Sequence, residues 1–364
     1  MSATARIDDV LERARRSRLD ALALTDRPWL VYGCGTAGRA WAESLARAGA
    51  TVRAFVDRHA PDTQALPVLR PDACPASWKT ECAVLLGLHN PGVDVGAVRA
   101  QLQGLGFAHV VLPQELIDHL PERAHFWLAP SAESLRAQAD ILAAHASLAD
   151  GGSRELFAAL LDQRLNAVAQ GLPMPDPDNA YLPPDLPAPS GALRFVDCGA
   201  YTGDTIANFR RLGHRFEAVA AFEPDPAHYS RLAAELAGER AAVFPCGVWN
   251  RMEQLRFTAN DAASHIAADG SAVIQTVSLD EALPGFAPTF IKMDIEGAES
   301  HALDGAYKTI ARDRPRLAIS AYHQPGDLWN LLLKIQRWDL GYRFHLRSHS
   351  FNGFDTVLYA LADE

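Results

Sequence analysis

Five continuous apolar runs after Leu193 constrain the fold more than any other feature of this sequence. Each ends in polar residues or glycine, and in order they are RFVDCG, EAVAAFEPD, AAVFPCG, TFIKMDIEG and RLAISAYH. Continuous runs, rather than alternating ones, are typical of strands buried on both faces of a mostly parallel sheet. Stretches of helical pattern separate them. We therefore predict an open α/β sheet for this half of the chain.

The last part of the sequence predicts an antiparallel hairpin at one edge of that sheet. Two strand-like runs lie in GYRFHLRSHSFNGFDTVLYAL, on either side of Asn352-Gly353. Asn-Gly between two such runs is a turn signal.

Residues 28–113 predict a smaller Rossmann-like α/β domain. Short apolar runs alternate with helical stretches, and the first run leads into Gly33-Cys-Gly35-Thr-Ala-Gly38. Asp57 follows the next run, at the distance where an acid binds a ribose in dinucleotide folds. The segment is about half the length of a full dinucleotide fold, and we find no hydride-transfer residues. Nucleotide binding and a scaffold role in packing or dimerisation both stay open.

A helical and then proline-rich segment joins these two regions. Residues 131–170 have helical spacing of apolar side chains, interrupted at Asp150-Gly-Gly-Ser153, where we expect Ser153 to cap the next helix. Residues 171–191 contain seven prolines and cannot form a helix or a central strand. The predicted domains are therefore 1–125, 126–190 and 191–364.

Composition excludes several classes of function. The chain has 364 residues, a formal net charge of −10, 48% apolar residues and five cysteines. Without a basic cluster, a nucleic-acid backbone is not expected as a partner. No run approaches the ~20 apolar residues of a membrane span, and none follows the basic N-terminus as in a signal peptide. Scattered cysteines in odd number fit a reducing cytoplasm, so we predict a soluble cytoplasmic protein.

The first strand of the C-terminal sheet leads into a glycine-rich turn, Asp197-Cys-Gly199-Ala-Tyr-Thr-Gly203. Ligands bind at the carboxyl ends of the strands in open α/β sheets, and glycines let the backbone approach them closely. Glu223 ends the next strand, about 20 residues on, where an acid can accept hydrogen bonds from a ribose diol. Together they predict a nucleoside-containing ligand.

Carboxylates and a histidine follow the fourth and fifth runs. Asp294 and Glu296 come directly after the fourth run, and His323 ends the fifth. Because these strand ends adjoin the ligand cleft, we expect the three side chains to converge there. They could orient an acceptor hydroxyl or remove its proton. The same three residues are the candidate ligands for Mg²⁺ or Mn²⁺, which would lower the pKa of a hydroxyl. His345 and His349 are weaker candidates.

Taken in order, these motifs resemble the FkbM-like methyltransferase family. The resemblance rests on VDCGAYTGDT, AFEPDP, PCGVWN, VSLDEAL, IKMDIEGAESHALDGA and RPRLAISAYHQPGDLW, and extends from about Ser153 to the end of the chain. It implies the class I methyltransferase fold, S-adenosylmethionine as methyl donor and O-methylation of a sugar, glycan or natural product. The cofactor contacts that we predict are Asp197, Gly199, Ala200, Tyr201, Thr202, Gly203, Glu223, Pro224 and Gly247.

We therefore predict an S-adenosylmethionine-dependent O-methyltransferase that acts on a small molecule or a glycan, with Asp294, Glu296 and His323 as catalytic residues. Two alternatives stay open: a non-catalytic module that binds a nucleotide or the cofactor, and an NAD(P)-dependent oxidoreductase using the N-terminal glycines. Tyr181, in the proline-rich segment, either covers the cofactor or packs the fold. The acceptor and the oligomeric state, including a homo-oligomer, are not determined by the sequence.

Overall fold

The computed structural model describes residues 3–16, 24–59, 66–120, 128–168, 171–258, 265–266 and 272–362. The chain divides into two compact units. Unit 1 comprises Met1–Leu142, Arg154–Pro175 and Ser350–Phe354, and unit 2 comprises Ala143–Ser153, Asp176–His349 and Asp355–Glu364. The predicted division into 1–125, 126–190 and 191–364 stays a prediction. Across the described residues, the helices are too short or too polar to span a membrane.

Unit 1 is built on a five-stranded parallel sheet in the order β3-β2-β1-β4-β5. Its strands are β1 Trp29–Tyr32, β2 Val52–Val56, β3 Val68–Leu69, β4 Ala83–Leu86 and β5 His109–Val111. The central strands β1 and β4 are buried throughout, as their apolar runs predict. Apolar clusters pack against both faces of this sheet, one around Trp29 and Trp41 and the other around Leu30 and Phe107.

The helices of the first 166 residues follow the predicted pattern. They are α1 Ala3–Arg16, α2 Thr36–Arg47, α3 Ala76–Glu81, α4 Val95–Gly104, α5 Ser131–Arg136, α6 Gln138–Ser147 and α7 Gly151–Asn166. Short 3-10 turns lie at η1 Pro113–Glu115 and η2 Ile117–His119. In α1, Ile7, Val10 and Leu11 recur at helical spacing and form a buried apolar face.

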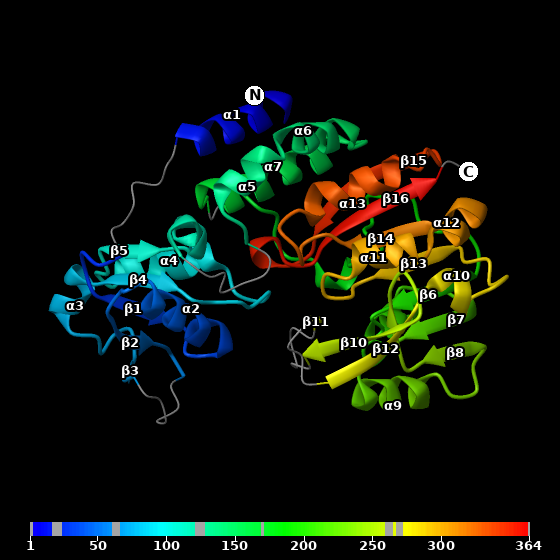
Figure 1. The fold of residues 1–364 in the computed structure, drawn as a ribbon, viewed down its shortest axis with the longest axis horizontal. Helices are drawn as coiled ribbons and strands as arrows, with labels where there is room; N and C mark the ends of the chain where they lie inside the picture. The colour runs from blue at the N-terminus through cyan, green and yellow to red at the C-terminus, as the bar shows by residue number, and fades with distance from the viewer. Residues whose placement is uncertain are drawn as a thin grey trace. The chain divides into compact units, whose positions relative to one another are not determined.

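Unit 2 contains a seven-stranded sheet in the order β15-β16-β14-β13-β6-β7-β8 (Figure 1). Its strands are β6 Leu193–Cys198, β7 Phe216–Phe222, β8 Ala241–Phe244, β13 Phe290–Met293, β14 Arg316–Ser320, β15 Tyr342–Ser348 and β16 Thr356–Ala362. The first five are parallel, whereas β16 runs antiparallel to both β14 and β15. The predicted fold class, a mostly parallel sheet with an antiparallel C-terminal hairpin after a smaller Rossmann-like sheet, is confirmed.

Helices connect the parallel strands of unit 2, and an aromatic cluster holds the centre of its sheet. The helices are α8 Asp204–Arg211, α9 Pro226–Glu235, α10 Leu279–Ala282, α11 Glu299–Asp304, α12 Tyr307–Asp313 and α13 Asp327–Gln336. The ring of Phe195 in β6 lies 5.1 Å from that of Phe209 and 5.6 Å from those of Phe216 and Phe290. Burying each such ring contributes about 1.5–3 kcal/mol, so the cluster fixes β6 against β13 and hence the loops that follow them.

A second, four-stranded sheet in unit 2 was not predicted from the sequence. Its order is β11-β10-β12-β9, formed by β9 Gly247–Val248, β10 Glu253–Thr258, β11 His265–Ile266 and β12 Ala272–Val277. Val273 in β12 is 60% exposed, and Met252, just before β10, is 66% exposed, so this sheet lacks the continuous apolar runs that mark the large sheet.

The break before α7 is formed differently from our expectation. Ser153 does not cap the helix but lies inside it, and Asp150 accepts hydrogen bonds from the Ser153 backbone N–H at 2.7 Å and hydroxyl at 2.7 Å. The aspartate therefore satisfies the helix start, because a carboxylate accepts from the free amides of the first turn.

The proline-rich segment lies mostly without regular structure, as predicted, with one 3-10 turn at η3 Pro177–Asn179. Leu182 and Leu186 nevertheless belong to the apolar cluster of unit 2 that contains Phe195. The segment 176–190 is thus fastened to the large sheet, and we call it the strap.

Candidate functional site

The glycine turn at residues 199–203 follows β6 and is fixed by close backbone packing. Gly199 has φ +77°, and a Cβ atom there would lie 1.9 Å from the backbone oxygen of Asp294, so no other residue fits. The N–H groups of Gly199 and Ala200 donate to the Phe222 oxygen at the end of β7, at 3.1 and 3.0 Å. Gly203, with φ +93°, precedes α8 and provides no side-chain cap for its first amides.

A buried ion pair lies directly beneath this turn. The Nζ atom of Lys292 is 3.1 Å from Oδ1 of Asp197, and their side chains are 3% and 0% exposed. The same Nζ donates to the Gly199 oxygen at 2.6 Å. Burial raises the pKa of Asp197 to about 6, with Lys292 opposing the rise. Burial disfavours the charged ammonium of Lys292, but Asp197 and Asp294 outweigh it and raise its pKa.

Glu223, at the end of β7, lies against the glycine turn. Its two carboxylate oxygens accept hydrogen bonds from the Tyr201 N–H and the Asp225 N–H, both at 2.9 Å. Tyr201 itself has φ +49° and is 45% exposed, and its ring centroid lies 4.3 Å from that of His228. Burial raises the pKa of Glu223, with backbone hydrogen bonds opposing the shift. The acid thus marks the edge of the turn with an exposed aromatic ring beside it.

The other predicted cofactor residues fall into two groups. Thr202 lies within the glycine turn and Pro224 directly follows Glu223, and both are half-buried. Gly247 instead opens β9 and pairs with Thr276 of the small sheet, outside the seven-stranded sheet. The structure therefore gathers all the predicted cofactor residues except Gly247 at the ends of β6 and β7.

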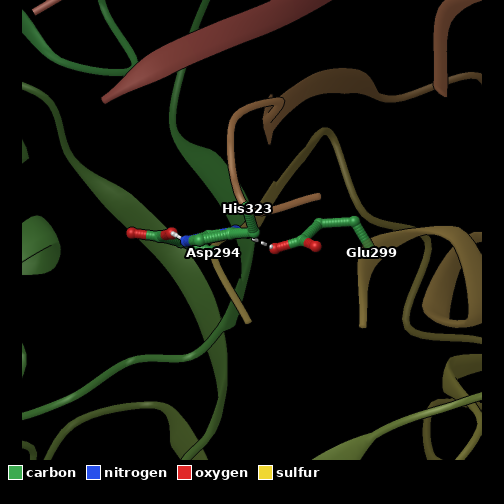
Figure 2. Close-up of side chains that lie close together, drawn as sticks. All are labelled: Asp294, Glu299 and His323. Atoms are coloured by element: carbon green, nitrogen blue, oxygen red, sulfur yellow. Dashed lines mark hydrogen bonds and ion pairs between the residues drawn. The ribbon is translucent and has the colours of Figure 1, made fainter. Parts of the chain in front are cut away.

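His323 follows β14 and lies between the carboxylates of Asp294, which follows β13, and Glu299, the first residue of α11, as Figure 2 shows. Its Nδ1 atom is 2.9 Å from Oε1 of Glu299, whose carboxylate also accepts the Ile295 N–H at 2.9 Å. Its Nε2 atom faces Oδ1 of Asp294 at 3.5 Å. His323 is 1% exposed and Glu299 0% exposed, so both are removed from water.

Glu296 completes the group from the loop after β13. Its Oε2 atom also lies 3.5 Å from Nε2 of His323, and its side chain is 34% exposed. The backbone of Glu296 has φ +56° and that of Gly297 has φ +97°. A left-handed glutamate is costly, by of order 1–3 kcal/mol, and such conformations concentrate at functional sites. The structure thus brings the three predicted catalytic residues together.

These groups have strongly shifted acidities. Burial raises the pKa of Glu296 to about 7, and the neighbouring carboxylates add to the shift while His323 opposes it. Burial opposes charge on His323, but Glu299, Asp294 and Glu296 outweigh it and raise its pKa to about 10. Burial also opposes charge on Asp294, yet Lys292 and His323 hold its pKa below the ordinary value. At neutral pH the site therefore contains an imidazolium, and Glu296 titrates near neutrality.

The strap adds a tyrosine to the same group. The Tyr181 hydroxyl donates to Oδ2 of Asp294 at 2.8 Å, and Lys292 Nζ lies 5.4 Å from the centre of its ring. Tyr181 has φ +70°, and its N–H donates to the Tyr359 hydroxyl at 3.3 Å. The ring therefore lies over the ends of both β6 and β13, next to the glycine turn.

Metal ligation by Asp294, Glu296 and His323 stays a prediction. Within the described part of the chain, the three side chains whose ligand atoms lie within 4.8 Å of one another are Asp294, Glu299 and His323. In Figure 2 they form a row with the imidazole in the middle. A cation at Nε2 would take the place of the imidazolium proton.

The two weaker histidine candidates lie elsewhere in unit 2. His345 is 2.6 Å from Asp150 through Nδ1, and His349 Nε2 is 2.8 Å from the Tyr359 hydroxyl. Both are buried, with His345 8% and His349 3% exposed. They hold the C-terminal hairpin to its neighbours.

Comparison with known proteins agrees with this geometry. A family model described as the methyltransferase FkbM domain matches residues 197–344, which contain the glycine turn, Glu223 and the His323 group. Residues 197–344 form a methyltransferase FkbM domain. The resemblance predicted from the sequence motifs is confirmed.

One solved structure is similar to this chain over nearly its whole length. The crystal structure of methyltransferase FkbM from Methylobacillus flagellatus KT is 23% identical, with a TM-score of 0.78 over 99% of this chain and 100% of that one. Fibrillarin from Aeropyrum pernix, with natively bound S-adenosyl-L-methionine, is 14% identical over 50% of this chain and 72% of its own, with a TM-score of 0.30. A search of curated proteins finds no match.

Two residues of the FkbM domain were not assigned a role from the sequence alone. Lys292 lies within a strand and reads as an isolated charge in an apolar run. Glu299 is the first residue of a helix, where an exposed acid is ordinary. Tyr181 lies outside this domain, and the sequence left open whether it covers the cofactor or packs the fold. Only the charge in a buried strand is a usable signal, because a lysine there needs a partner.

Proposed function

We propose that this protein transfers a methyl group from S-adenosylmethionine to a hydroxyl oxygen of a sugar, a glycan or a glycosylated natural product. The proposal rests on the pKa and the position of Glu296. Its pKa is raised to about 7, and it follows β13, which lies next to β6, the strand that leads into the glycine turn. A general base is most effective when its pKa is near the working pH.

The residues at the ends of β6 and β7 fit S-adenosylmethionine. Its amino-acid part carries a carboxylate, which suits the uncapped first amides of α8 after Gly203. Its ribose diol suits the carboxylate of Glu223, which retains acceptor capacity beyond its two backbone hydrogen bonds. The exposed ring of Tyr201 offers an apolar face beside that acid. When bound, the cofactor supplies a methyl group activated by a sulfonium.

The side chains of the site then have separate roles. Glu296 accepts the proton that leaves the acceptor hydroxyl as the new C–O bond forms. Asp294, held through Oδ2 by Tyr181, orients the acceptor with Oδ1. Glu299 fixes the imidazolium of His323. Its positive charge offsets the repulsion between the neighbouring carboxylates of Asp294 and Glu296. This assignment requires no nucleic acid and no membrane, and we place the protein in the cytoplasm.

The first experiment needs no acceptor. Thermal unfolding is recorded with S-adenosylhomocysteine and, in parallel, with NADH. A ligand at 100 times its dissociation constant stabilises by about 2.7 kcal/mol. That corresponds to a rise of roughly 5–10 °C in the unfolding midpoint. We expect the rise with S-adenosylhomocysteine and its loss in Glu223→Ala. A rise with NADH alone would favour the oxidoreductase alternative and overturn the proposal.

The second experiment tests the chemistry. Release of S-adenosylhomocysteine is measured against a panel of glycosides, comparing the wild type with Glu296→Gln. The matched control is Glu235→Gln, on the outer helix α9, whose side chain is 57% exposed. Loss of a general base lowers the rate by about 10²–10⁴-fold, so we expect Glu296→Gln to lose turnover and the control to keep it. Cofactor binding without turnover of any hydroxyl acceptor would favour the non-catalytic module.

A further inference from the structure

We propose that Lys292 is a positioning residue for the cofactor, because its ammonium holds the glycine turn from beneath in the conformation that binds S-adenosylhomocysteine. This inference rests on the proposed function, since it concerns the same cleft. It assigns a ligand-binding consequence to a side chain that lies inside the sheet and reaches no ligand itself.

The ammonium is fixed by strand register. β13 pairs with β6 so that Lys292 lies beside Asp197, and Nζ is 3.1 Å from Oδ1 of that residue. Strand pairing explains why a lysine lies beside Asp197, but it does not explain the second contact of the ammonium. That contact is the hydrogen bond to the Gly199 oxygen at 2.6 Å, while the Cys198 oxygen lies at 3.5 Å. The charge is therefore shared between the carboxylate and the turn.

The second contact determines how the turn is held. Gly199 is left-handed at φ +77° and packs on the Asp294 backbone, so its carbonyl orientation is determined at that position. The Tyr201 N–H is held by Glu223 on the other side. Lys292 thus holds one end of the segment 199–201 and Glu223 holds the other, and the segment itself contains no charged side chain. Without the ammonium, the half-buried Gly199 carbonyl would lose its partner and the turn would relax.

A purely structural alternative is that the ion pair only stabilises the sheet. Removing Lys292 alone would leave Asp197 as an unpaired buried carboxylate, which can prevent folding. The test therefore uses Asp197→Asn as the background, in which no charge is left unpaired when Lys292→Met is added. Asp197→Asn alone removes the ion pair, but the ammonium keeps its hydrogen bond to the Gly199 oxygen and the nearby charge of Asp294.

The control is a second lysine with the same two kinds of contact in a more exposed place, since the side chains of Lys334 and Asp304 are 23% and 50% exposed. Lys334 Nζ lies 2.7 Å from Asp304 and donates to the Ser300 oxygen at 2.7 Å, on α11 and α13 rather than at the turn. The control pair is Asp304→Asn with and without Lys334→Met. It has the same chemistry but does not contact residues 199–203.

Affinity for S-adenosylhomocysteine is measured by calorimetry on the full chain, well below each variant's unfolding midpoint. We expect Lys292→Met to weaken binding by about 10- to 100-fold in the Asp197→Asn background, the effect of losing one charge-assisted hydrogen bond. Lys334→Met in the Asp304→Asn background should change it by no more than about 2-fold.

The outcomes are distinguishable. If the wild type binds but Lys292→Met with Asp197→Asn binds no more weakly than Asp197→Asn alone, the positioning role is overturned and the proposed function stands. A loss of equal size in the Lys334 control would also overturn it, because general destabilisation would explain both. If the wild type itself does not bind S-adenosylhomocysteine, the proposed function falls and the positioning role falls with it.

Discussion

Glu299→Ala should destabilise unit 2 strongly, although an acid at the start of a helix is usually a surface residue. The Glu299 carboxylate is wholly buried, and its Oε1 atom contacts both the Ile295 N–H and Nδ1 of His323 at 2.9 Å. Removing one partner of a buried, hydrogen-bonded ion pair costs about 3–5 kcal/mol. At roughly 2–4 °C per kcal/mol for a domain of this size, the unfolding midpoint should fall by about 6–20 °C.

The measurement is urea and thermal unfolding followed by tryptophan fluorescence, with two comparison variants. Glu299→Gln keeps an oxygen that can accept the Ile295 N–H, so its loss should be smaller. Glu217→Gln removes a half-exposed carboxylate that pairs with Arg194 at 2.7 Å, and a surface pair contributes about 0–1 kcal/mol. If Glu299→Ala costs no more than Glu217→Gln, the argument from burial is wrong.

Four further outcomes are expected. Turnover should fall as the pH drops through about 7, where Glu296 becomes protonated, and a rate that is flat from pH 6 to 8 would exclude it as the base. Tyr181→Phe should lower kcat while leaving affinity for S-adenosylhomocysteine unchanged, because its hydroxyl holds Asp294; an equal loss of affinity would contradict this. Burial opposes but Ser153, His345 and Arg347 lower the pKa of Asp150, so its stabilisation is present above about pH 4 and lost below it. Stability curves of the wild type and Asp150→Asn should therefore converge in acid, and a constant difference would refute the linkage. If Asp294, Glu296 and His323 hold a cation, exhaustive chelation should abolish turnover and added Mn²⁺ should restore it. Turnover that is unchanged by chelation would contradict metal ligation.

The sequence predicts the large sheet well because burial on both faces requires unbroken apolar runs. Each of the five runs after Leu193 became a parallel strand, and the turn signal at Asn352-Gly353 lies between β15 and β16. The small sheet was not predicted because its strands are partly exposed, as Val273 in β12 shows. Periodicity detects a strand only where burial imposes a pattern.

The candidate site also has one part that the sequence predicts and another that it does not. Strand ends in a parallel sheet meet at one edge, so the convergence of Asp294, Glu296 and His323 could be predicted from their positions alone. The contacts of Glu299 and Tyr181 depend on how a helix and the strap pack, which no local pattern encodes. The capping role at Asp150 was assigned to Ser153 because both residue types favour helix starts, and only the geometry separates them.

Unit 1 is formed by segments that lie far apart in the sequence, and this has a consequence for biosynthesis. The sheet of unit 1 is formed within residues 29–111, but unit 1 also includes residues 350–354. These residues are translated only after the segment 176–349 of unit 2. At about 5–20 residues per second, the ribosome needs many seconds between these two parts. Unit 1 must therefore persist through most of translation without its last segment, so that a chain stalled in unit 2 would expose both units as incomplete.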